Sequence, residues 1–150
     1  MKRGFTVLEL ILVMVILGIL AATAVYGFKT HHLRDDVHFV QMQLLKTQYQ
    51  GMLYDKRGLA QPNDYGCMEL TQAAIAQRAR QAKYAFKSTV QSSLHTLCFD
   101  AMGRPHVDDN ATKPASLITA KTKILTLHYE QKSVDFYTLP ATGYVIIHQD

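Results

Sequence analysis

A nearly continuous apolar segment close to the N-terminus restricts the fold of this 150-residue chain more than any other feature. It runs from Phe5 to Val25, and its only polar residues are Thr6, Glu9 and Thr23. As a helix with a rise of ~1.5 Å per residue, the segment is long enough to cross the ~30 Å hydrocarbon core of a bilayer. A secretory signal peptide would have a longer basic region and a shorter apolar region, followed by an Ala-x-Ala cleavage site. We therefore predict a helix that stays with the protein as a membrane anchor.

The charge of the chain gives little support for nucleic-acid binding. The formal net charge is +4, but Lys2 and Arg3 precede the apolar segment, and without them 14 basic residues against 12 acidic residues leave +2. A net charge of this size is a weak argument for a polyanionic partner. The length of the chain suits one folded domain with an appendage.

No residue pattern indicates catalysis or cofactor binding. A Gly-rich phosphate loop, a GxSxG elbow and an HExxH pair are all missing from the sequence. His95 and Cys98 are three residues apart, so on a strand they would point to opposite faces. His31 and His38 share a helix face but lie two turns apart, which is too far for one metal ion without a third element. We therefore predict no enzymatic activity, no metal and no cofactor.

Glu9 is unexpected within the apolar segment, because a charged side chain inside a bilayer costs at least ~2.5 kcal/mol and so indicates a function. Its neighbours form a pattern: a short basic leader ending at Gly4, then Phe5 and Thr6, then Glu9, with Gly18 inside the apolar run. From residue 1 to residue 25 this pattern resembles the type IV prepilin family.

The resemblance implies a role for each residue of the pattern. Lys2 and Arg3 would supply the leader charge, and prepilin peptidase would cleave between Gly4 and Phe5 on the cytoplasmic side. The same enzyme would methylate the new amino group of Phe5. Glu9 would attract the positive N-terminus of a neighbouring subunit, because a carboxylate in a low-dielectric bundle is tolerated when it is paired. The implied partners are other pilins or pseudopilins, prepilin peptidase, the inner-membrane assembly platform and inner-membrane lipid.

The apolar pattern after the anchor becomes amphipathic. Apolar side chains recur near one face at helical spacing. They are Leu33, Val37, Val40, Leu44 and Met52. One helix is therefore predicted from Phe5 to about Tyr54, with Asp55–Gly58 as the turn that ends it.

The predicted organisation has four parts. Residues 1–4 form the prepilin leader, 5–25 the transmembrane or filament-core helix, 26–54 its amphipathic continuation, and 55–150 a periplasmic head domain. The fold class is α+β, with the long N-terminal helix packed on a C-terminal antiparallel β head, as in a pilin.

The predicted head contains one short helix and several strands. The helix covers Glu69–Lys83, which is rich in Ala and Gln and shows no strand alternation. The predicted strands are Leu94–Asp100, Lys123–Glu130, Val134–Leu139 and Tyr144–His148. Predicted turns and loops cover Leu59–Cys67, Met102–Arg104, Asn110–Pro114 and Gln131–Ser133.

Two short segments resemble one group within the prepilin family. Leu97–Pro105 resembles a strand and turn in the head that is shared by pseudopilin H of type II secretion and related minor pilins. Thr142–Val145 resembles the Thr-Gly strand near the C-terminus of the same group. These segments favour a minor subunit over a major pilin, either of the mannose-sensitive haemagglutinin type or of a secretion pseudopilus.

The two cysteines, Cys67 and Cys98, are 31 residues apart and form no metal-binding pair. If the head is exported, the periplasm would oxidise them to one disulfide, and two buried free thiols are the alternative.

These observations lead to two hypotheses of different classes. The first is a structural minor subunit of a type IV pilus or type II secretion pseudopilus, held in the inner membrane by a single pass with its head in the periplasm. Secreted cargo is a further candidate partner of this structural subunit. The second hypothesis is a minor pilin that binds DNA for uptake. The candidate DNA contacts are the basic residues Arg78, Arg80, Lys83, Lys87 and Arg104, and a solvated helix face is the alternative explanation for them.

Overall fold

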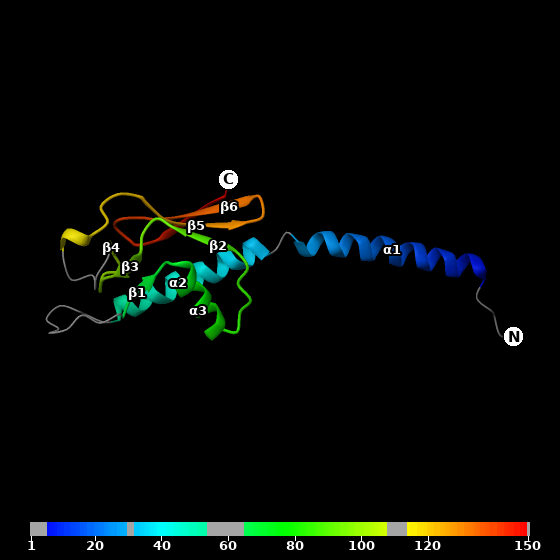
Figure 1. Cartoon of the computed structure of the whole chain (residues 1–150), viewed down its shortest axis with the longest axis horizontal. Helices are drawn as coiled ribbons and strands as arrows, with labels where there is room; N and C mark the ends of the chain where they lie inside the picture. The colour runs from blue at the N-terminus through cyan, green and yellow to red at the C-terminus, as the bar shows by residue number, and fades with distance from the viewer. Residues whose placement is uncertain (1–5, 30–31, 54–64, 108–113, 150) are drawn as a thin grey trace. The chain divides into compact units, whose positions relative to one another are not determined.

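The computed structural model describes residues 6–29, 32–53, 65–107 and 114–149 (Figure 1). The chain divides into two compact units, Met1–His32 and Leu33–Asp150. The elements of the second unit follow one another as a helix, a short strand, a second helix and then strands (Figure 1).

Two helices occupy the region for which the sequence predicts one. Helix α1 spans Val7–Lys29 and helix α2 spans His32–Met52. Residues 30 and 31, between them, lie outside the described residues, as do the predicted turn 55–58 and most of the predicted loop that follows it. Side chains of the first unit are described as far as residue 23, and all of those from Thr6 onward are exposed.

One face of α2 forms part of the core of the head. Leu33, Val37, Val40 and Leu44 are buried, as the helical spacing predicts. The predicted fifth member of that face, Met52, is instead 47% exposed. The prediction was wrong at this position, because a period of 3.6 residues continues the face through Thr47 and Gly51, which are both buried.

The strands of the head form two antiparallel sheets. The first sheet has the order β1-β3-β4 and consists of β1 (Cys67–Glu69), β3 (Thr96–Phe99) and β4 (Pro105–Val107). The second has the order β2-β5-β6-β7 and consists of β2 (Thr89–Ser92), β5 (Thr122–Tyr129), β6 (Lys132–Thr138) and β7 (Val145–Gln149). Helix α3 (Gln72–Gln81) lies between β1 and β2 in the chain. The predicted α+β class is confirmed.

Several element boundaries differ from the predictions for local reasons. Helix α3 begins after Thr71, whose hydroxyl accepts a hydrogen bond from the Ala74 N–H at 3.2 Å and so caps the helix. The predicted helix therefore started too early, and its first residue, Glu69, is instead the last residue of β1. The hairpin between β5 and β6 turns at Glu130 and Gln131 rather than at Gln131–Ser133, and Glu130 has a positive φ of 55°.

Backbone contact between α2 and the first sheet depends on glycine. A Cβ atom on Gly51 would lie 2.5 Å from the Phe99 carbonyl oxygen. Gly66 has a φ of +70°, and a Cβ atom there would collide with the backbone of Gly51. The end of α2 therefore packs on the loop before β1 and on the end of β3 with no side chain between the backbones.

Candidate functional site

The start of α1 is a capping box built from Thr6 and Glu9. The Thr6 backbone N–H and the Thr6 hydroxyl both donate to Glu9 Oε2, each at 3.0 Å. In return, the Glu9 N–H donates to Thr6 Oγ1 at 3.4 Å. This reciprocal pairing satisfies donors that the first turn of a helix otherwise leaves free. Glu9 therefore has a partner within its own chain as well as the inter-subunit role that the sequence predicts for it.

The third polar residue of the apolar segment is also paired within α1. The Thr23 hydroxyl lies 3.1 Å from the Ile19 carbonyl oxygen and 3.0 Å from the Leu20 carbonyl oxygen. Internal pairing of this kind lowers the cost of placing a hydroxyl in an apolar environment. The predicted leader and cleavage residues, Lys2, Arg3, Gly4 and Phe5, lie outside the described residues.

A buried carboxylate that the sequence analysis did not single out ties α2 to the segment after α3. Asp36 is 1% exposed. Its Oδ2 atom accepts hydrogen bonds from the N–H groups of Lys87 and Ser88, at 3.1 and 2.7 Å, and from the Ser88 hydroxyl at 2.6 Å. The Tyr84 hydroxyl donates to Oδ1 at 2.7 Å. Burial, with the Asp36 hydrogen bond and negative charge as further causes, raises the pKa of Tyr84 well above its usual value.

One feature of the sequence indicates that Asp36 has a structural role. Asp36 lies on the buried face of α2, three residues after Leu33 and four residues before Val40. A charged residue on a buried face requires partners, but the sequence does not show that Ser88 supplies them from 52 residues away.

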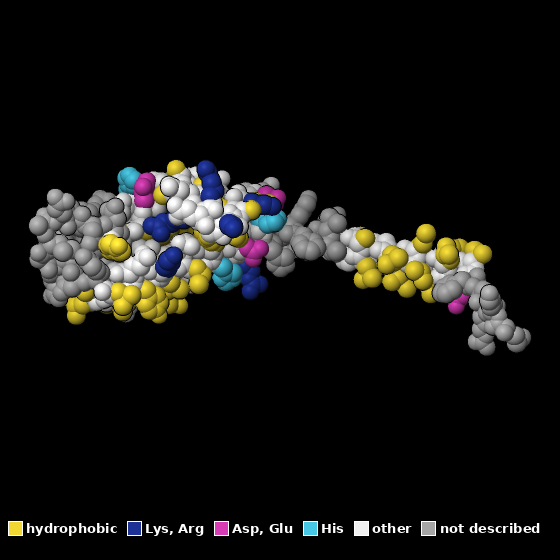
Figure 2. Space-filling model, turned by 90° about the horizontal axis from the view of Figure 1, so that it is seen from below, with side chains coloured by type: hydrophobic (Ala, Val, Ile, Leu, Met, Phe, Trp, Pro, Cys, Tyr) yellow, Lys and Arg dark blue, Asp and Glu magenta, His cyan; other side chains and the backbone are white. Residues whose placement is uncertain are grey.

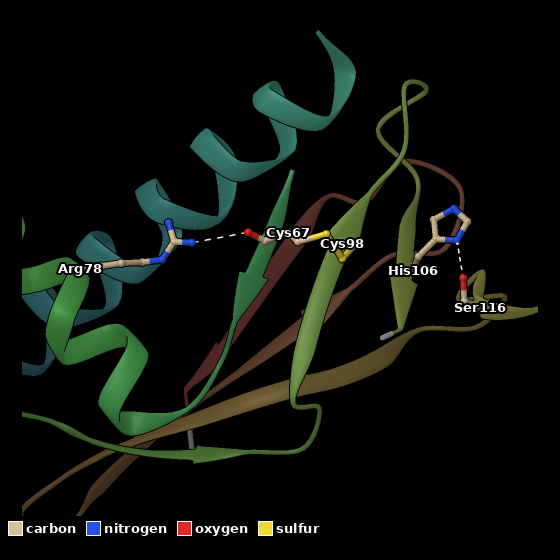
Figure 3. Close-up of a disulfide and its surroundings, with 5 residues drawn as sticks. All are labelled: Cys67, Arg78, Cys98, His106 and Ser116. Atoms are coloured by element: carbon tan, nitrogen blue, oxygen red, sulfur yellow. Dashed lines mark hydrogen bonds between the residues drawn. A yellow bond between two sulfur atoms is a disulfide. The ribbon is translucent and has the colours of Figure 1, made fainter. Parts of the chain in front are cut away.

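Cys67 and Cys98 are joined by a disulfide, and they lie directly opposite each other on β1 and β3 (Figure 3). The next pair of opposite residues, Gly66 and Phe99, is hydrogen-bonded, because the Phe99 N–H donates to the Gly66 carbonyl oxygen at 2.8 Å. Alternation along an antiparallel ladder then makes Cys67 and Cys98 a non-hydrogen-bonded pair, the kind in which the side chains lie closer. Cys98 is fully buried, so the bridge fastens the edge strand β1 to the interior of its sheet.

The turn between β3 and β4 is organised by Asp100. Its Oδ1 accepts from the N–H groups of Met102 and Arg104 at 2.9 and 2.8 Å, and the Arg104 Nε and Nη2 atoms both lie 2.8 Å from its Oδ2. The Nε2 atom of buried His106 lies 3.4 Å from Asp100 Oδ2. Its Nδ1 atom lies 3.0 Å from Ser116 Oγ, the contact drawn in Figure 3. Burial raises the pKa of Asp100, but the hydrogen bonds from Arg104, Met102 and His106 outweigh it and hold the pKa below its usual value.

The order Ser116, His106, Asp100 superficially matches a nucleophile, a base and an orienting acid. The environment of the three residues instead fits a structural role. His106 is only 3% exposed, and both oxygens of Asp100 are bound by Arg104. A general base must reach a substrate proton, which a buried ring held on both sides does not do.

The predicted basic residues do not all form one group. Arg78 and Arg80 lie in the last turn of α3, and Lys83 and Lys87 follow it in the chain. Arg78 points back toward β1, with its Nη2 atom 3.5 Å from the Cys67 carbonyl oxygen (Figure 3). Arg104 belongs to the β3–β4 turn and is paired with Asp100. Because its charge is already compensated there, Arg104 is a poor candidate for a phosphate contact.

The described histidines are dispersed. His95 lies just before β3, and its Nδ1 atom is 3.9 Å from Glu69 Oε1. His32 and His38 belong to α2, whereas His31 lies outside the described residues. Within the described part of the chain, no group of three or more His, Cys, Asp or Glu side chains could hold a metal ion.

Comparison with known proteins gives one match, at the start of the chain. Residues 1–25 match the family model described as the prokaryotic N-terminal methylation motif. No curated protein and no solved structure matches the chain. Across the residues that the structure describes, no helix reaches both the length and the apolar character needed to cross a membrane. The matched motif supports a type IV prepilin-like protein, a membrane-anchored substrate of prepilin peptidase that assembles with other pilins.

Proposed function

We propose that this chain is a structural minor subunit of a type IV pilus or a type II secretion pseudopilus. The observation that carries the proposal is the methylation motif at residues 1–25, which ends within an apolar helix whose start is capped by Thr6 and Glu9. In this proposal, prepilin peptidase cleaves between Gly4 and Phe5 and methylates the new amino group. The apolar segment 5–25 holds the subunit in the inner membrane as a single pass until it is assembled.

The polar groups of α1 are compatible both with insertion in the membrane and with packing in the filament core. Thr6, Glu9 and Thr23 are all hydrogen-bonded within the helix, so the helix can enter an apolar environment with few free donors or acceptors. Glu9 retains a second carboxylate oxygen, Oε1, to which no described hydrogen bond is directed. We propose that the amino group of a neighbouring subunit approaches this carboxylate during assembly and sets the register of the two helices.

In this proposal the head is a stable periplasmic domain that catalyses no reaction. Two of its hydrogen-bonded carboxylates, Asp36 and Asp100, hold backbone segments together. The Cys67–Cys98 disulfide suits the oxidising periplasm. Together these features agree with a stable head in an exported filament subunit.

The proposal is tested by fractionating filaments from the native host. Epitope-tagged full-length chain should be recovered with sheared or purified filaments when prepilin peptidase is present, and should remain in the membrane fraction when the peptidase is deleted. The matched control is the same chain with Gly4→Leu, which places a bulky residue at the cleavage site. Recovery of this variant and of the parent chain in equal amounts with the filaments would contradict the proposal.

A further inference from the structure

Helix α2 carries a second row of apolar side chains that does not belong to the core. Its members lie three or four residues apart, so they share one face of the helix. They are Met42, Leu45, Tyr49 and Met52, and we call them the α2 apolar row. Met42, Tyr49 and Met52 are 64%, 65% and 47% exposed, and Leu45 is half-buried. The face of α2 that packs in the core uses other positions, among them Val40, Leu44 and Thr47.

Two turns of the head extend this surface beside the end of α2. The Gln48 Nε2 atom donates to the carbonyl oxygens of Gly103 and Thr142, at 3.0 and 2.7 Å. Next to these residues, Met102 is 72% exposed and Tyr144 is 56% exposed. Figure 2 shows apolar side chains gathered along one margin of the head unit. Surfaces rich in Met and Tyr are typical of contacts between proteins.

The spacing of the row indicates a helix as its partner. Apolar residues at alternating steps of three and four form the seam along which two helices pack. In a parallel pair, the positions that flank such a seam would bring Lys46 opposite Gln41 of the second helix, and Gln48 opposite Leu53, the residue that follows that helix. No two like charges meet along residues 41–53, so this part of α2 is electrostatically compatible with a parallel copy of itself.

The short step in sequence between α1 and α2 favours contact between the α2 helices of two copies. Helix α2 begins at His32, three residues after α1 ends at Lys29, and three peptide steps span at most ~11 Å. Copies gathered through α1 therefore bring their α2 helices close together. Copies inserted in one membrane also point in the same direction, which favours a parallel over an antiparallel pair.

We propose that the α2 apolar row packs in parallel against the same row of a second copy of this chain. The proposal rests on the function proposed above, because the anchor supplies both the shared direction and the high local concentration. A seam of three turns is short, so the pair is expected to form between anchored copies rather than between free heads.

Single cysteine substitutions in the full-length chain test this pairing in membranes of a host that carries prepilin peptidase. Met42→Cys, Tyr49→Cys and Met52→Cys place a thiol on the row, and Gln50→Cys places a thiol at another exposed position, on a different face of α2. Cys67 and Cys98 are already joined to each other. After mild oxidation, dimers are counted on a non-reducing gel, and the linked peptides are identified by mass spectrometry.

The expected result is several-fold more dimer for all three row variants than for Gln50→Cys, with each thiol linked to its own counterpart. Equal yields for the row variants and Gln50→Cys would overturn the proposal, as would linkage at Met42 without linkage at Met52, since the two rows would then not lie side by side along their length. The N-terminus of the parent chain is read from the same membranes. An uncleaved parent contradicts the prepilin function, whereas a cleaved parent without row-specific dimers contradicts the pairing alone.

Discussion

The carboxylate of Asp36 accepts hydrogen bonds from both the backbone N–H and the hydroxyl of Ser88, at 2.7 and 2.6 Å, across 52 positions of the chain. This contact joins the start of α2 to the residue that precedes β2. The ring of Tyr84, a further Asp36 partner, stacks on Phe39 with the centroids 4.7 Å apart. The junction therefore combines a buried charge with aromatic packing and holds the second sheet to the helix.

Replacing Asp36 with Ala is expected to lower the free energy of unfolding by about 3 kcal/mol, because several buried donors lose their acceptor. The matched control is Asp35→Ala, next in the chain but exposed, which should change stability by less than about 0.5 kcal/mol. Denaturant unfolding of the full-length chain in detergent, followed by circular dichroism, measures both changes. Equal effects of the two substitutions would show that Asp36 does not fasten the head.

Acid should weaken the β3–β4 turn through Asp100. Its pKa lies below the usual 3.8 in the folded chain, so the turn is fully stabilised above pH 3.8. That stabilisation is lost as the pH falls below 3.8 and through the lower folded pKa, where the carboxylate takes up a proton. Chemical unfolding at a series of pH values should show a smaller loss over this range for Asp100→Asn than for the parent chain. The same acid dependence in both chains would remove Asp100 as a cause.

Gly51→Ala tests the close packing of α2 on β3. The new methyl group would lie 2.5 Å from the Phe99 carbonyl oxygen, so the helix and strand must separate. The expected loss is about 1–3 kcal/mol of unfolding free energy, measured by the same denaturant unfolding. Gly18→Ala is the matched control, since a Cβ atom there meets nothing within 4 Å in the chain itself. A Gly51→Ala chain as stable as the parent chain would contradict the packing described.

Glu9 variants separate the capping of α1 from the pairing of subunits. Glu9→Gln retains an oxygen that can accept from the Thr6 N–H, but it removes the charge that would attract an amino group. Glu9→Ala removes both. If the charge sets the register of neighbouring subunits, both variants should remain inserted in the membrane and both should be largely missing from the filament fraction. Normal incorporation of Glu9→Gln would leave helix capping as the role of this residue.

Local patterns predicted much of the fold. The apolar period of α2 located the buried side chains from Leu33 to Leu44, and the predicted strands match β5, β6 and β7 within one or two residues at each end. The strands that were missed, β1, β2 and β4, have three or four residues each. Such strands are too short to show a period, and they are fixed by pairing with distant segments instead.

In the candidate site too, the features of one continuous segment could be predicted, whereas contacts between distant segments could not. The residue order from Gly4 to Glu9 carries the motif directly, because the chemistry of cleavage and anchoring depends on a continuous segment. The partnership of Asp36 with Ser88, and that of Asp100 with His106, depends on how distant elements pack. The exposure of Met52 followed from the drift of a 3.6-residue period, which places Gly51 in the core at the end of α2.

Mass spectrometry of the N-terminal peptide tests the central claim most directly. The chain is purified from its native host with prepilin peptidase present and with it deleted. We predict a mature chain that begins at N-methylated Phe5 in the first case and the full leader in the second. A chain that keeps residues 1–4 in both hosts would contradict the prepilin assignment and leave the filament role without support.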